Sequence, residues 1–94
     1  MTVGFVMIKV HSGGELQAYN KLKNVSDVVE IYQIFGEFDL IVKIVGDDFE
    51  SIANIVVHKI RTIDEVIDTK TITGMEIWLN WIKSNIYFLL INYC

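Results

Sequence analysis

The residues best suited to chemistry stand together in one short segment, Gly36-Glu37-Phe38-Asp39. The carboxylate of Asp39 could anchor a small cationic group, while exposed backbone amides of Gly36 to Phe38 could receive an anion. A zwitterion such as an amino acid needs both groups at once. The alternative is structural, because an aspartate in a turn commonly accepts hydrogen bonds from nearby backbone amides. Local chemistry alone favours the structural role and leaves the binding role open.

The remaining reactive side chains do not form a recognisable catalytic or metal site. His11 and His58 fall on different predicted elements, so we expect neither a metal site nor a histidine-activated nucleophile, and we interpret both as satisfied or solvated. The single cysteine, Cys94, excludes an internal disulfide and a cysteine cluster. The pair Gly13-Gly14 is too short to cradle a phosphate. We therefore predict no catalytic residue, no metal and no cofactor.

Two β-rich runs flank the turn and would position it. The sequence VVEIYQIFGEFDLIVKIV is rich in residues that suit a half-buried pleated surface, and Gly36 permits the positive φ of a tight reversal. A hairpin is thus predicted, with strands near Val28–Phe35 and Asp39–Val45. A first strand is predicted over Val3–Val10 and a last one over Glu65–Thr73.

Two helices are predicted between these strands. Ser12 and Glu15 have the spacing of a capping box, which would open a helix that runs to about Lys23. Its inward residues would be Leu16, Tyr19 and Leu22. Asp47 and Asp48 favour a second helix start. Apolar residues then recur at helical spacing, and the inward set would be Phe49, Ile52, Ala53, Val56, Ile60 and Ile63.

The predicted order is β-α-β-β-α-β. Right-handed crossovers then give a ferredoxin-like α+β sandwich, with a four-stranded antiparallel sheet and both helices on one face. We predict one such domain over residues 1–77 and an apolar C-terminal extension over residues 78–94. The extension is shorter than the ~20 apolar residues of a spanning helix and contains Lys83 and three asparagines, so membrane insertion is not expected.

Alternation along the strands predicts two apolar sheet faces. One face carries Val6, Ile8, Val10, Leu40, Val42 and Ile44, which we place under the helices. The other carries Phe5, Met7, Ile41 and Val45 mixed with lysine. With 52% hydrophobic residues in a 94-residue chain, that second face suits a subunit interface. The alternative is that residues 78–94 cover it.

Charge and cysteine content restrict the partners and the compartment. The net charge of −4 and the scattered basic residues give no electrostatic basis for binding a phosphate backbone, so direct nucleic-acid binding is not expected. The single cysteine, together with an N-terminus that lacks the features of a signal peptide, indicates a reducing cytoplasm.

The hairpin and its setting resemble the Lrp/AsnC family of feast/famine regulators, whose effector-binding (RAM) domain carries a G-x-[YF]-D turn between two apolar strands. The resemblance runs from about Phe5 to Met75 and includes the FVMIKV strand, the glycine-containing helix start, the Asp-Asp helix start and the threonine-rich last strand. It implies a domain that dimerises through its sheets, assembles into larger rings and binds amino acids between dimers near this turn.

The resemblance also implies site residues and partners. Carried over by motif position, the ligand-binding residues are Gly36, Glu37, Phe38, Asp39, Thr69 and Thr71. The sequence departs from the family by beginning at the effector domain, without a helix-turn-helix, and by having Asp64-Glu65 where a proline-glycine pair is usual. The implied function is a stand-alone amino-acid-binding and oligomerising module, not an enzyme, with full-length Lrp/AsnC regulators as candidate partners.

Two other functions remain open. Small dimeric α+β barrels include cofactor-independent monooxygenases, which need polar groups converging between helices and sheet. Here the helix-facing residues are essentially all aliphatic. The second alternative is an assembly protein that binds no ligand.

Overall fold

The computed structural model describes residues 1–74, so the predicted extension over residues 78–94 lies outside the described residues. The elements follow in the order β1 (Thr2–Val10), α1 (Glu15–Lys23), β2 (Val28–Gln33), β3 (Leu40–Gly46), α2 (Phe49–Ile55), η1 (Val56–Ile60) and β4 (Val66–Gly74). The segment η1 is a π-helical turn that continues α2. The predicted β-α-β-β-α-β order is confirmed.

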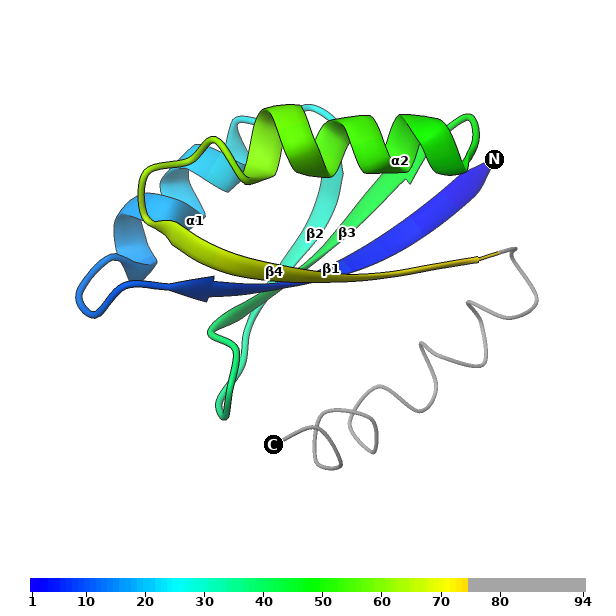
Figure 1. Ribbon diagram of the computed structural model, residues 1–94. Helices are drawn as coiled ribbons and strands as arrows, with labels where there is room; N and C mark the ends of the chain where they lie inside the picture. The colour runs from blue at the N-terminus through cyan, green and yellow to red at the C-terminus, as the bar shows by residue number, and fades with distance from the viewer. Residues whose placement is uncertain (75–94) are drawn as a thin grey trace.

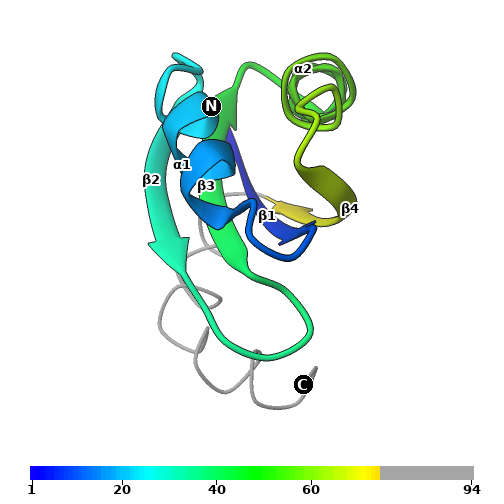
Figure 2. The ribbon, with the colours of Figure 1, turned by 90° about the vertical axis from the view of Figure 1, so that its left-hand side faces the viewer.

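The four strands form one antiparallel sheet in the order β2-β3-β1-β4. Both helices lie on the same side of this sheet (Figure 1). Viewed along the strands, α1 lies toward the β2 edge and α2 toward the β4 edge (Figure 2). The ferredoxin-like sandwich is therefore confirmed. Among the described residues, no helix has the length and apolar character needed to cross a membrane.

The main core lies between the helices and the sheet. Its buried side chains are all aliphatic: Val6, Ile8, Val10, Ala18, Leu22, Leu40, Val42, Ile44, Ile52, Ile55, Val56, Ile60 and Ile63. Two glycines let α2 approach the sheet closely. A Cβ at Gly4 would lie 3.0 Å from Ile52 Cγ2, and one at Gly46 would lie 3.0 Å from Ser51 Cβ. The predicted helix-facing residues of β1 and β3 are confirmed.

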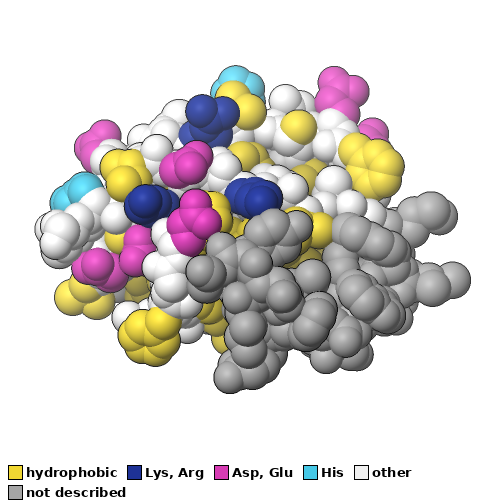
Figure 3. Space-filling view, turned by 60° about the horizontal axis from the view of Figure 1, so that its bottom comes forward, with side chains coloured by type: hydrophobic (Ala, Val, Ile, Leu, Met, Phe, Trp, Pro, Cys, Tyr) yellow, Lys and Arg dark blue, Asp and Glu magenta, His cyan; other side chains and the backbone are white. Residues whose placement is uncertain are grey.

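The opposite sheet face carries a second apolar cluster. Its buried members are Val3, Phe5, Met7, Phe38 and Ile41. Phe38 comes from the hairpin loop, which extends to this side of the sheet (Figure 1). Lysine and acidic side chains lie beside hydrophobic ones on the part of this side that Figure 3 leaves visible. The predicted mixture of apolar residues and lysine is confirmed; its role as a subunit interface stays a prediction.

The second helix begins as predicted, and the predicted burial of Ile52, Val56, Ile60 and Ile63 is confirmed, but the other two predicted inward residues are exposed. The amide of Ser51 donates a hydrogen bond to Asp48 Oδ1 over 2.8 Å, so Asp48 is the N-cap. Phe49 is 54% exposed and Ala53 is also exposed, so their predicted inward positions were wrong. Ile55 is buried instead, because it shares the sheet-facing side of the helix with Ile52.

The first helix begins later than predicted. The amide of Gly14 donates to the carbonyl of His11 over 2.9 Å, and Gly13 has a φ of +85°, as in a type II turn. This turn occupies the residues that the capping box would have used, so the N-cap is Gly14 without a side-chain cap. Ser12 as N-cap was therefore wrong.

The later start also changes which residues of α1 face the sheet. The helix buries Ala18 and Leu22, which lie four positions apart on one face. Leu16 is 71% exposed and Tyr19 is 38% exposed. The inward position of Leu22 is confirmed, whereas those of Leu16 and Tyr19 were wrong.

An ion pair joins α1 to the segment before β4 and should make stability depend on pH. Lys21 Nζ donates to Glu65 Oε1 over 2.7 Å. This hydrogen bond lowers the pKa of Glu65 below its ordinary value of 4.5. A carboxyl whose pKa is lowered by folding stabilises the folded chain above its unfolded pKa, and that contribution is lost as the pH falls through the folded pKa.

We therefore expect stability to decrease as the pH falls below about 4.5, and to do so less steeply in Glu65→Gln. Urea unfolding across the acid range measures this slope. Lys21→Met should flatten the slope in the same way, because it removes the donor that lowers the pKa of Glu65. An unchanged slope in both variants would contradict the assignment of the pair.

Candidate functional site

The Gly36–Asp39 turn closes the hairpin between β2 and β3. The amide of Ile34 donates to the carbonyl of Asp39 over 3.0 Å, so the loop leaves the sheet after Ile34 and returns at Asp39. Within it, Gly36 has a φ of +125°, a backbone conformation that residues with a Cβ rarely adopt. The predicted glycine-dependent reversal is confirmed.

Asp39 fixes this loop to the end of β1. Its Oδ2 accepts a hydrogen bond from the amide of Val10 over 2.9 Å. Its own amide donates to the carbonyl of Ile8, also over 2.9 Å. The carboxylate thus holds a backbone amide, as the structural alternative proposed, but the amide belongs to a strand 29 positions away and not to the turn itself. A role for Asp39 in binding a ligand stays a prediction.

The other turn residues divide into a buried anchor and an exposed part. Phe38 is 7% exposed and belongs to the second apolar cluster. Gly36 and Glu37 are exposed, and so is the preceding Phe35. The loop is therefore held at Phe38 and Asp39, while Gly36 and Glu37 remain exposed. The loop itself lies on the side of the sheet away from the helices (Figure 1).

The two threonines of the predicted site lie elsewhere in the chain. Thr69 is paired with Ile8, and Thr71 with Val6. Residues that are directly opposite in an antiparallel pair share a face, so both threonines lie on the helix side of β4. The structure brings Gly36, Glu37, Phe38 and Asp39 together but does not bring Thr69 or Thr71 to them within one chain. Their ligand-binding role stays a prediction.

The two histidines do not add to the hairpin site. His11 is exposed in the turn between β1 and α1, and His58 is exposed on η1. In residues 1–74, no group of three or more histidine, cysteine or acidic residues is arranged to hold a metal ion. The hairpin therefore offers backbone amides and carboxylates, which suit hydrogen bonding and charge recognition of a small polar molecule.

A groove that was not predicted from the sequence lies at the other end of the sheet. It has a volume of about 560 Å³ and runs beside α2, where Ser51, Asn54 and His58 line it. These positions are separated by three and four residues, so they share one helix face. These three polar residues at helical spacing were the sequence signal for the groove. His58 was instead considered alone and interpreted as a solvated residue.

Comparisons with known proteins find the family that the hairpin and its setting resemble. The family model of the Lrp/AsnC ligand binding domain matches residues 3–79. Regulatory protein AsnC of Escherichia coli K12 is 29% identical over 59 residues, which cover 63% of this chain and 39% of that protein. The chain thus matches well under half of the length of this curated relative.

Solved structures show the same fold. The crystal structure of FFRP-DM1 is similar with a TM-score of 0.75 and 31% identity, covering 80% of this chain and all of that one. The transcriptional regulator NMB0573 of Neisseria meningitidis, solved as a complex with L-Met, has a TM-score of 0.71 and 12% identity, covering 80% of this chain and 50% of that one. Because the family model covers most of the sequence, the chain belongs to the Lrp/AsnC ligand-binding domain family.

Proposed function

We propose that this protein binds an amino acid or a similar small metabolite at the hairpin turn, and that it thereby modulates transcription regulators. The observation that carries this proposal is the fixed geometry of the turn. The Asp39–Val10 hydrogen bond and the burial of Phe38 hold the loop from two sides. A loop that is already ordered loses little conformational freedom when a ligand binds, which favours affinity.

The accessible part of the turn has the chemistry that a zwitterion requires. The exposed peptide between Gly36 and Glu37 can donate to a ligand carboxylate, and the exposed carboxylate of Glu37 can accept from a ligand ammonium. Asp39 would contribute mainly by keeping these groups in place. NMB0573 is a protein of the same fold that was solved with an amino acid, L-Met, which supports this class of ligand.

Self-association is the second part of the proposal. The turn is continuous with the second apolar cluster through Phe38, so a copy that packed on this face would lie beside the ligand. Thr69 and Thr71, on the other side of the sheet, would join a site only if another copy brought them to it. Residues 1–77 would form this binding and assembly domain, residues 78–94 would be an extension to it, and full-length Lrp/AsnC regulators would be mixed-assembly partners in the cytoplasm.

The aliphatic core supports binding in preference to catalysis. An enzyme of the small dimeric α+β barrel type would need polar groups between helices and sheet. In residues 1–74, the only buried polar or charged residue is Glu65, which pairs with Lys21, and the buried cluster between helices and sheet is aliphatic. A regulatory binding module needs nothing polar there.

A thermal-shift screen of the twenty amino acids tests the proposal. A ligand at 100 times its dissociation constant should add about 2.7 kcal/mol to the free energy of unfolding and raise the melting temperature by roughly 10 °C or more. Glu37→Gln should weaken the shift, whereas Glu50→Gln, the same change on the exposed start of α2, should leave it unaltered.

Two outcomes would contradict the proposal. If no amino acid raises the melting temperature, the sensor function loses its support. If light scattering gives the mass of a single chain with and without ligand, the assembly part is wrong.

A further inference from the structure

The outer edge of β2 has backbone groups that no strand within residues 1–74 pairs with. β2 and β4 are the two edge strands of the sheet. The amide of Ile34 donates to the carbonyl of Asp39, so the backbone groups of Ile34 face β3. Hydrogen-bonded and non-hydrogen-bonded positions alternate along an antiparallel pair, so Ile31 and Gln33 turn their amides and carbonyls to the free edge.

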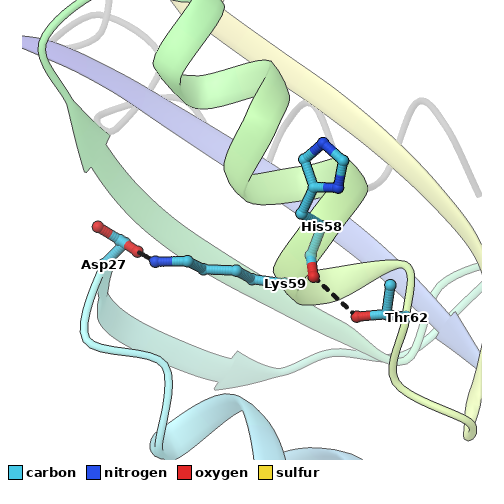
Figure 4. Close-up of polar contacts among 4 residues, drawn as sticks. All are labelled: Asp27, His58, Lys59 and Thr62. Carbon is cyan, nitrogen blue, oxygen red and sulfur yellow. Dashed lines mark hydrogen bonds and ion pairs between the residues drawn. The ribbon is translucent and has the colours of Figure 1, made fainter.

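The strand β2 is fixed at both of its ends. Before it, Lys59 Nζ donates to Asp27 Oδ2 over 2.7 Å, in the wall of the groove beside α2 (Figure 4). The carbonyl of Asp27 also accepts from the amide of Val45 over 3.2 Å. After β2, the Ile34–Asp39 hydrogen bond joins the chain to β3. An edge strand that is already ordered is a template on which a further strand can pair.

A small pocket adjoins this edge on the helix side of the sheet. It has a volume of about 330 Å³ and is lined by Glu15, Leu16, Tyr19, Gln33 and Leu40. This volume lies at the lower end of the range for ligand sites, about 300–1,000 Å³, and suits one long side chain. Residues directly opposite in an antiparallel pair share a face, so the residue of an added strand opposite Gln33 would place its side chain at this pocket.

The flank of α1 beside this edge carries one charge of each sign. Glu15, Tyr19 and Lys23 follow each other at intervals of four, so they share one helix face. That face lies toward β2, because Glu15 and Tyr19 line the pocket together with Gln33. Within residues 1–74, neither the carboxylate of Glu15 nor the ammonium of Lys23 has a hydrogen-bond or ion-pair partner. Both charges are therefore open to a partner from outside.

The two charges define the pattern that a partner strand must carry. Glu15 and Lys23 are eight helical residues apart, which corresponds to a rise of about 12 Å, and four residues of a strand extend about 13 Å. The pocket places the start of α1 beside Gln33, at the end of β2, so the two elements run in opposite directions. A strand added antiparallel to β2 would match with a basic residue opposite Gln33 and an acidic residue four positions later.

A second copy of this chain does not supply that pattern at its own edge strands. β4 carries Asp68 and then Lys70, with the acidic residue first and only two positions between them. Their partners on β1 are Lys9 and Met7, so both side chains lie on the face away from the helices. β2 has Glu30 as its one charged residue. The pattern therefore points to a segment of another protein.

We propose that the β2 edge binds an extended segment of another protein as a fifth strand, with the pattern Arg/Lys-x-x-x-Asp/Glu. The stem of the basic side chain would lie on Tyr19 and its cationic group would pair with Glu15, while the acidic side chain would pair with Lys23. Hydrogen bonds to the backbone of Ile31 and Gln33 would provide affinity, and the two charges would select the partner and its direction. This binding does not require an amino acid at the hairpin.

Titration of the ¹⁵N-labelled full chain with the peptide acetyl-Val-Arg-Thr-Val-Thr-Glu-Val-amide, followed by NMR, tests the edge. The amides of Ile31 and Gln33 should shift in a saturable way and exchange more slowly with solvent. N-methylation of the peptide arginine removes the N–H that would donate to the carbonyl of Gln33, so it should weaken binding about tenfold or more. N-methylation of the threonine that follows, whose amide faces away from β2, should not.

Protein variants test the charge pattern. Glu15→Gln should weaken peptide binding about two- to fivefold, as expected for an exposed ion pair, whereas Glu50→Gln, the same change in the first turn of α2, should not. Glu15→Lys should reverse the preference at the arginine position of the peptide, so that a peptide with glutamate there binds better than the original.

Three results would overturn the inference. The first is that the amides of Ile31 and Gln33 do not move at millimolar peptide. The second is equal binding of a peptide in which arginine and glutamate have changed places. The third is slow exchange of both amides without peptide that is lost on dilution of the chain, which would assign the edge to a second copy. None of them affects the hairpin proposal, which rests on the amides of residues 36–40.

Discussion

Replacement of Ile8 by alanine should lower the free energy of unfolding by about 2–5 kcal/mol. Ile8 lies in the middle of β1 with no exposed surface, and it belongs to the aliphatic cluster under the helices. Alanine would remove buried methyl and methylene groups and leave a cavity that the sheet and helices cannot fill completely. Urea unfolding followed by circular dichroism measures the difference.

The same substitution at Ile67 is the matched control. Ile67 lies on β4 and is 58% exposed, so its replacement should change the free energy of unfolding by less than ~0.5 kcal/mol. Equal losses for Ile8→Ala and Ile67→Ala would show that the helices do not cover the face to which Ile8 belongs.

Replacement of Asp39 by alanine should cost about 1–3 kcal/mol of stability, because the amide of Val10 loses its acceptor. The hairpin loop should also become less ordered, and the Val10 amide should exchange with solvent faster. Asp39→Asn keeps a side-chain oxygen that can accept, so its loss should be smaller. Hydrogen exchange and urea unfolding together give both readouts.

Glu37→Ala separates this structural effect from a general effect of charge in the loop. Glu37 is exposed two residues before Asp39, so its loss should leave the exchange of the Val10 amide unchanged. If Asp39→Ala behaves like Glu37→Ala in both measurements, Asp39 does not hold the turn.

Local sequence patterns were sufficient to predict the element order and the two sheet faces. Strand alternation placed Val6, Ile8 and Val42 under the helices, because one alternating set of each strand is purely apolar whereas the other contains a lysine, Lys9 or Lys43. The Asp48 cap was predictable because its partner, the amide of Ser51, is only three residues away in the chain. The start of α1 was not, because the turn at Gly13 and the capping box compete for the same residues.

The candidate site was only partly predictable. The motif at Gly36 to Asp39 identified the turn and its positive φ, but the partner of Asp39 is a backbone amide on β1, which only the folded sheet brings into reach. The groove beside α2 was missed because its walls come from three separate segments. Its ion pair joins Asp27 and Lys59 across 32 positions of the chain.

Binding of an amino acid at the hairpin turn is tested most directly by an NMR titration of the ¹⁵N-labelled chain with the amino acid that gives the largest thermal shift. We expect the amides of Gly36 to Leu40 and of Val10, which is bonded to Asp39, to shift in a saturable way with the same dissociation constant. Saturable binding that leaves these amides unmoved, or no saturable shift with any amino acid, would contradict it.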